Sequence, residues 1–104
     1  MTEARSMWEV MVPTHDNDGQ KFPVSHHQEW DKTVQDIAGG QTLLGVVRGR
    51  WIDEATGAKY EESMIPVRIA CTSEQIDEIG VHTKRHYGQI AVLAYCISND
   101  VRLY

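Results

Sequence analysis

Two helix-start signals, one in each half of the chain, constrain the fold of this sequence more than any other feature. Ser25 with Gln28, and Thr72 with Gln75, have the spacing of a capping box, in which two side chains bind the first free backbone groups of a helix. Apolar residues follow each signal at helical spacing. They are Trp30, Val34, Ile37 and Ala38 after the first signal, and Ile76, Ile79, Thr83 and His86 or Tyr87 after the second. The sequence therefore predicts two amphipathic helices, the first ending at Gly39 and Gly40.

The segments between these helices have the alternating pattern of β-strands. Strands are predicted at 7–13, 42–52, about 60–71 and 89–97, with a hairpin turn at 53–57. The chain has ten Val and eight Ile but four Leu, which favours a sheet over a helical bundle. The order β-α-β-β-α-β predicts an α+β fold, a ferredoxin-like sandwich whose antiparallel four-stranded sheet carries two helices on one face.

The chain length predicts the number of domains, and one proline conflicts with the predicted strand pairing. A chain of 104 residues is the size of one domain, so we expect a single ferredoxin-like domain over residues 1–104. Pro66 falls within the third predicted strand, which is central in this fold, and its missing N–H removes a ladder hydrogen bond. A bulge at that point would accommodate it.

Charge and cysteine content narrow the classes of function. The formal net charge of −5 is opposite to that of a general nucleic-acid binder, so we expect no nucleic-acid partner. No apolar run has the ~20 residues of a membrane span and the first residues have no signal-peptide pattern, so we expect a cytoplasmic protein without a membrane partner. Cys71 and Cys96 lie in apolar strands and are expected to be buried and reduced.

A sheet covered by helices on one face leaves its other face open. On that face the pattern places Met7, Glu9, Met11, Met64 and Arg68. An open, partly apolar face usually packs against a partner. We therefore expect self-association, as a homotrimer or a homodimer.

The second and third predicted strands carry the candidate binding residues. A phenol, a carboxylate and guanidinium groups on paired strands could bind a small charged ligand, or position an acid–base pair of Glu62 and Tyr60. The alternative is that they form cross-strand ion pairs on a solvated hairpin. The candidate ligand-binding residues are Arg48, Arg50, Tyr60, Glu62 and Arg68.

Histidines are the other group of residues that could carry out a chemical function, because they can bind a metal ion. His82 and His86 have helical i, i+4 spacing, and His26 and His27 open the first helix. Antiparallel helices would bring the two pairs close enough for a zinc or nickel site. Because no carboxylate pattern completes the set, a surface or packed histidine cluster is favoured and no metal is expected. No phosphate-binding or other cofactor motif is present, so no cofactor is expected.

The element order and the hairpin resemble two known groups of proteins. The layout, with the segment from Gly49 to Glu62, is similar to the PII-like proteins, which include bacterial proteins of unassigned function. This resemblance implies a trimeric ferredoxin-like module with ligands in clefts between subunits. The Tyr60-Glu61-Glu62 step is also similar to the phage S-adenosylmethionine lyases, which implies that Glu62 contacts the substrate amino group beside Tyr60.

Three functions follow as hypotheses. The first is a PII-like module that binds a small charged metabolite between subunits. The second is a small-molecule lyase that depends on Glu62. The third is an oligomerisation or protein-interaction domain whose open face is consumed by subunit contacts.

Overall fold

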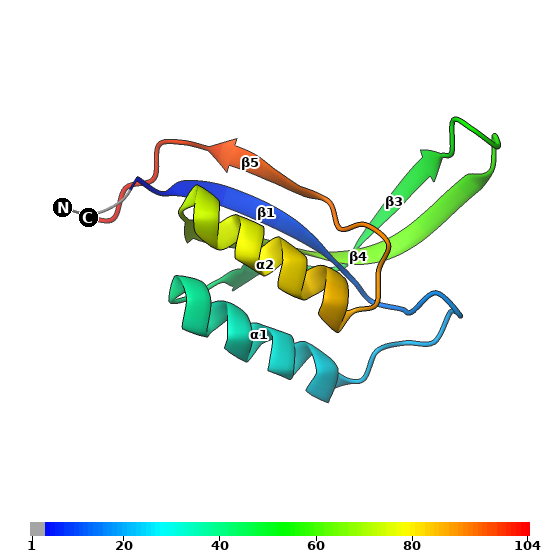
Figure 1. Ribbon diagram of the computed structural model, residues 1–104, viewed down its shortest axis with the longest axis horizontal. Coiled ribbons are helices and arrows are strands. Elements are labelled where there is room, and N and C mark those ends of the chain that lie inside the picture. The colour runs from blue at the N-terminus through cyan, green and yellow to red at the C-terminus, as the bar shows by residue number, and fades with distance from the viewer. Residues whose placement is uncertain (1–3) are drawn as a thin grey trace.

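The computed structural model describes residues 4–104 and has two helices packed on one face of a β-sheet (Figure 1). This is the predicted α+β, ferredoxin-like architecture. The helices run antiparallel, so that the start of the first lies beside the end of the second (Figure 1). The elements are β1 (Ser6–Pro13), α1 (Val24–Ala38), β2 (Thr42–Leu43), β3 (Val47–Ile52), β4 (Lys59–Cys71), α2 (Ser73–His86) and β5 (Ala94–Ser98).

The antiparallel sheet is built around β1 and the long strand β4. β1 pairs with β4 from Ser6↔Cys71 to Pro13↔Met64, and β5 pairs with the other edge of β1. Alternate residues of the two central strands point toward the helices and are buried. With the helix residues that cover them, they form the core: Val10, Val12, Trp30, Val34, Ala38, Val67, Ile69, Cys71, Ile76, Ile79 and Tyr87.

The predicted strand at 42–52 is two strands, which gives the sheet five strands in place of four. β2 ends opposite Val67 and β3 begins opposite Met64. Residues 44–46 therefore lie opposite residues 65–66, and this extra residue is the bulge expected near Pro66. The Pro66 carbonyl accepts from the amide of Leu44. The edge of Pro66 that lacks an N–H thus faces the break between β2 and β3, where few ladder bonds are lost.

The two predicted capping boxes have different outcomes. Thr72 and Gln75 form a complete box, with the Gln75 amide donating to the Thr72 hydroxyl (3.2 Å) and the Thr72 amide donating to Gln75 Oε1 (2.9 Å). The Ser25 prediction is wrong, because α1 already begins at Val24 and its N-cap is Pro23, without a side-chain cap. Pro23 has an extended backbone, with φ −68° and ψ 155°, and the helix begins directly after it, two residues earlier than predicted.

Substitution of the two predicted cap residues should have different effects on the free energy of unfolding. Thr72→Ala is expected to lower the free energy of unfolding by about 1 kcal/mol, because it leaves the Gln75 amide without its acceptor. Ser25→Ala, which removes the same hydroxyl type from an exposed site, should change it by less than about 0.5 kcal/mol. Urea unfolding followed by circular dichroism measures both. Equal losses would show that the cap at Thr72 does not stabilise α2.

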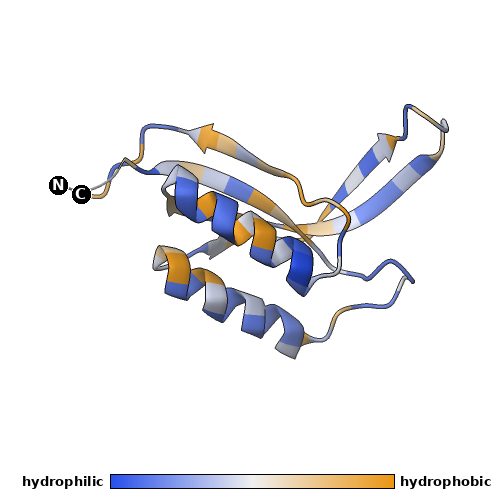
Figure 2. Ribbon diagram, in the orientation of Figure 1, coloured by the Kyte–Doolittle hydropathy of each residue, from blue (hydrophilic) through white to orange (hydrophobic). Residues whose placement is uncertain are grey.

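The C-terminal strand differs from its prediction. β5 begins at Ala94, later than the predicted residue 89, and lies at the sheet edge. Cys96 is consequently exposed, which corrects the expectation that both thiols are buried. Cys71 is buried, and burial raises the pKa of its thiol to about 11. Figure 2 shows β5 and the segment leading into it mostly in orange, so this edge is rich in apolar residues.

Candidate functional site

The face of the sheet that the helices leave uncovered carries a buried carboxylate. Glu9 in the middle of β1 has a side chain only 8% exposed. Arg68 of β4 donates from Nε to Glu9 Oε1 at 3.1 Å, and the Tyr95 hydroxyl of β5 donates to Oε2. Both carboxylate oxygens are therefore bound, each by a different neighbouring strand. A charge buried on a sheet requires such partners.

A depression of about 380 Å³ lies beside this network at the sheet edge. Two guanidinium groups, Arg5 and Arg68, contribute to it, and no residue of its lining is acidic. Arg68 uses Nε for Glu9, which leaves its other N–H donors for a ligand. The remaining lining comes from the end of α1, the loop after it, the start of β2 and both central strands: Met7, Ala38, Gly39, Gly40, Gln41, Thr42 and Ala70.

The candidate residues of the β3–β4 hairpin lie on two different faces. Tyr60 is paired with Trp51 and shares the uncovered face with Glu62 and Arg68, because alternate residues of β4 point the same way. Arg48 and Arg50 point to the opposite face, where both bind Glu61 at 3.3 and 3.2 Å. All three of these side chains are at least half exposed. The two arginines thus form the solvated cross-strand ion pairs considered as the alternative.

The remaining three candidates are separated along β4. Arg68 is six positions after Glu62 along the strand, which corresponds to about 20 Å at the rise of a β-strand. The hairpin projects away from the body of the molecule (Figure 1). Within one chain, a small ligand therefore cannot contact Tyr60 or Glu62 together with Arg68. Near the hairpin, Tyr60 stacks on Trp51 with ring centroids 4.4 Å apart.

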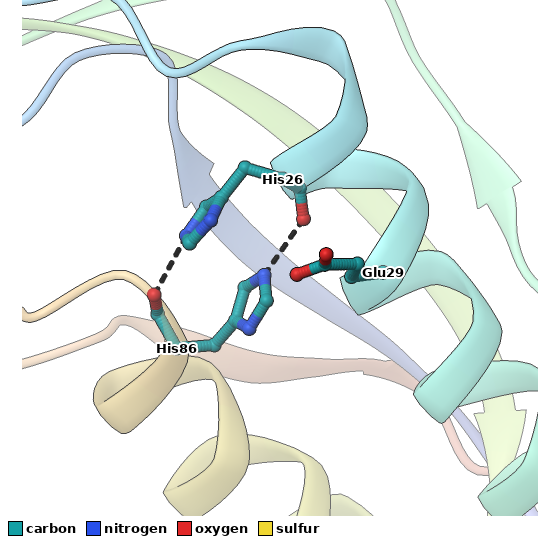
Figure 3. Close-up of side chains that lie close together, drawn as sticks. All are labelled: His26, Glu29 and His86. Carbon is teal, nitrogen blue, oxygen red and sulfur yellow. Dashed lines mark hydrogen bonds between the residues drawn. The ribbon is translucent and has the colours of Figure 1, made fainter.

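The helix layer brings the histidines together, as the antiparallel arrangement predicts. His26 and His86 stack with centroids 3.9 Å apart, and the Nε2 of each donates to the backbone carbonyl of the other at 2.7 Å (Figure 3). His27 Nδ1 lies 2.6 Å from the Tyr87 hydroxyl, so His26 and His27 both reach the end of α2. His82 lies one turn earlier, with its ring centroid 5.4 Å from that of His86.

Burial shifts the protonation of several groups in this cluster. It lowers the pKa of His27, and the nearby His26 lowers that pKa further. Burial also lowers the pKa of His82, with a smaller contribution from His86. The pKa of the Tyr87 hydroxyl is raised by burial and by the Asp31 carboxylate. The neutral forms of these side chains are favoured at pH 7.

Three residues in these two clusters were not identified as site residues from the sequence. Glu9 and Tyr95 become partners of Arg68 only through the pairing of β1 with β4 and β5. Glu29 lies beside His26 and His86, although the sequence indicated no carboxylate with these histidines. The local signal for Glu29 was its spacing, since it is three residues after His26 and therefore on the same face of α1.

Comparison with known proteins identifies the fold. No protein-family model and no curated protein sequence matches this chain. A phage SAM lyase solved in complex with S-methyl-5'-thioadenosine superposes with a TM-score of 0.70 at 11% identity, covering 95% of this chain and 84% of the lyase. The periplasmic divalent cation tolerance protein CutA from Archaeoglobus fulgidus has a TM-score of 0.68 at 11% identity, covering 95% and 87%. CutA1 from Oryza sativa has a TM-score of 0.69 at 10% identity, covering 95% and 83%.

The TM-scores show similarity of fold, and identities this low show the fold alone. Both groups to which the sequence was compared are thereby supported at the level of architecture, the lyase directly and the PII-like layout through CutA. In residues 4–104, neither helix combines the length and the apolar character needed to cross a lipid bilayer. The chain therefore shares the ferredoxin-like fold of the CutA proteins and the phage SAM lyase.

Proposed function

We propose that this protein is a self-associating, cytoplasmic, PII-like module that binds a small charged metabolite in a cleft between subunits. The observation that carries the proposal is the pair of guanidiniums, Arg5 and Arg68, in a depression without acidic residues on the uncovered face. Its volume of about 380 Å³ lies within the range of small-molecule sites. Guanidinium groups bind carboxylate and phosphate oxygens, so the metabolite carries an anionic group.

Self-association is supported by the apolar side chains that one copy leaves in solvent. Trp51 is 48% and Tyr60 is 43% exposed on the hairpin, and Tyr95 and Ile97 are 41% and 42% exposed on β5. These residues flank the uncovered face on both sides, a distribution typical of a surface that binds a partner. A homotrimer and a homodimer both satisfy this requirement.

A second copy would also supply what one chain lacks at the depression. Glu62 is about 20 Å from Arg68 along β4 and Tyr60 is farther, so they can contribute to its site only from another subunit. In this arrangement, Arg5 and Arg68 of one subunit bind the anionic end of the metabolite. Glu62 on the projecting hairpin of another subunit binds its cationic end.

Native mass spectrometry of gently purified protein tests this proposal. We expect a dimer or trimer that retains a small molecule, and loss of that added mass in Arg68→Ala, Arg5→Ala and Glu62→Ala. Arg5→Ala is informative on its own because Arg5 is exposed and makes no ion pair within residues 4–104. Arg102→Ala is the matched control, since Arg102 pairs with Asp100 near the C-terminus. A monomer, or unchanged retention by the Arg5 and Glu62 variants, would contradict the proposal. An oligomer without any bound mass would favour the interaction-domain hypothesis.

A lyase is the second candidate function. It is favoured by the fold shared with a phage SAM lyase and by the placement of Tyr60 and Glu62 on one face of β4. Incubation with S-adenosylmethionine should then yield methylthioadenosine, and Glu62→Gln should abolish the product. Equal production by wild type and Glu62→Gln would exclude the proposed role of Glu62.

A further inference from the structure

The start of α1 and the end of α2 bring together three side chains that can bind a metal. One ligating atom from each of His26, Glu29 and His86 lies within 4.8 Å of those of the other two. The two imidazoles face each other between the helices, with the Glu29 carboxylate directed toward them (Figure 3). We propose that these three residues form a binding site for a divalent transition-metal ion of the zinc type.

The histidine rings are held in place before any ion arrives. His26 stacks on Phe22 at 5.0 Å and on His86 at 3.9 Å. Tyr87 packs edge-on against both imidazoles, with centroids 5.1 Å from each. The in-plane lone pairs of two nearly parallel rings do not converge on one point, so a bound ion would have to turn at least one imidazole out of this stack.

The hydrogen bonds of the two rings are compatible with metal binding. Each Nε2 donates to a backbone carbonyl, which leaves the lone pair of each neutral ring on Nδ1. A carbonyl acceptor at the second nitrogen is the usual outer contact of a metal-bound histidine. An ion with bonds of ~2.1 Å holds its donor atoms roughly 3.4 Å apart, so the site must contract on binding. The exposed Glu29 side chain can reach the ion by changing rotamer, and the two histidine nitrogens reach it by rotation of a ring out of the stack.

The donor set determines the class of ion. Two imidazole nitrogens with one carboxylate oxygen suit Zn²⁺, Co²⁺ or Ni²⁺ better than Mg²⁺ or Ca²⁺, which prefer sites made of oxygen atoms. Three protein ligands leave further coordination positions to water. Glu29 is free to act as a ligand, because the ion pairs found among residues 4–104 use Glu9, Glu61 and Asp100 and not Glu29.

This site is separate from the proposed metabolite site. His26, Glu29 and His86 belong to the helix layer, whereas Arg5 and Arg68 line a depression that opens on the uncovered face. A bound ion would join the first two turns of α1 to the last turn of α2, and it would stabilise the folded chain by mass action. Success or failure of either proposal therefore leaves the other intact.

Equilibrium dialysis of the full chain against Zn²⁺ tests the site. We expect one ion per chain for the wild type, a 10- to 100-fold weaker affinity for Glu29→Gln, and loss of binding for His86→Gln. Glu78→Gln is the matched control, because it removes the same charge from an exposed position on α2 and should bind as the wild type does. Co²⁺ in place of Zn²⁺ should give visible absorption bands with the wild type and the control that are weakened in Glu29→Gln.

The comparison of Glu29→Gln with Glu78→Gln decides the outcome even if His86→Gln fails to fold. Glu29 is exposed and no side-chain hydrogen bond depends on its carboxylate within residues 4–104, so its replacement should not disturb the fold. Equal affinity in the two glutamine variants would overturn the proposal. Absence of Zn²⁺ binding by the wild type at millimolar concentration would overturn it as well.

Discussion

Replacement of Trp30 with alanine is expected to lower the free energy of unfolding by about 3–5 kcal/mol, the usual cost of removing a large aromatic side chain from a core. Trp30 is 1% exposed and packs between the helix layer and the sheet. Its indole Nε1 donates to the Thr83 hydroxyl at 2.8 Å, and that hydroxyl donates to the carbonyl of Ile79 at 2.6 Å. The substitution therefore opens a cavity and also removes a buried side-chain hydrogen bond between α1 and α2.

Two further variants would separate these contributions. Trp30→Phe keeps most of the apolar volume but removes the hydrogen bond, so a smaller loss of about 1–3 kcal/mol is expected. Trp51→Ala removes the same residue type from a half-exposed position on the hairpin and should cost less than Trp30→Ala. Urea unfolding at a fixed protein concentration measures all three. A loss below about 1 kcal/mol for Trp30→Ala would mean that the core does not depend on this residue.

Replacement of Arg68 with methionine is expected to cost about 1–3 kcal/mol, because it leaves the Glu9 carboxylate buried with Tyr95 as its remaining partner. The loss should be smaller than for a fully buried ion pair, since 47% of the Arg68 side chain is exposed to water. Arg50→Met is the matched control. Arg50 also binds a glutamate, but its side chain is 74% exposed, so its removal should change stability by less than about 0.5 kcal/mol.

A double-mutant cycle would identify the cause of this loss. If an unpaired buried carboxylate is responsible, Arg68→Met should cost much less in a Glu9→Gln background, where no negative charge remains. Urea midpoints of the four proteins at equal concentration provide the comparison. Strictly additive losses would show that Glu9 and Arg68 stabilise the sheet independently. The contact between them would then contribute no coupling free energy to the stability of the fold.

Local sequence patterns were sufficient for most of the fold. The capping box at Thr72, the apolar stripes of both helices and the glycine at position 57, whose φ is 72°, are properties of neighbouring residues. Each of these features is stabilised within a few residues along the chain. Local interactions therefore predicted the order of the elements, except that the strand expected at 42–52 is divided into β2 and β3. The antiparallel helices that bring His26 beside His86 followed from the fold type that this order indicates.

The composition of the candidate sites depended on pairing between distant strands. The sequence placed Arg48 and Arg50 with Tyr60 and Glu62, but the register puts Trp51 opposite Tyr60 and thereby turns both arginines to the other face. A shift of one residue in register reverses every side chain of a strand, and no local pattern fixes that register on a solvated hairpin.

What the sequence alone determined was the element order and the capped helix α2, because these follow from interactions between near neighbours. Only the tertiary structure decided which charged groups meet. Glu9, Arg68 and Tyr95 lie on three different strands, and Glu29 lies beside His86 through the packing of one helix on another. Such contacts join residues far apart in the chain, and burial of the shared core fixes them together.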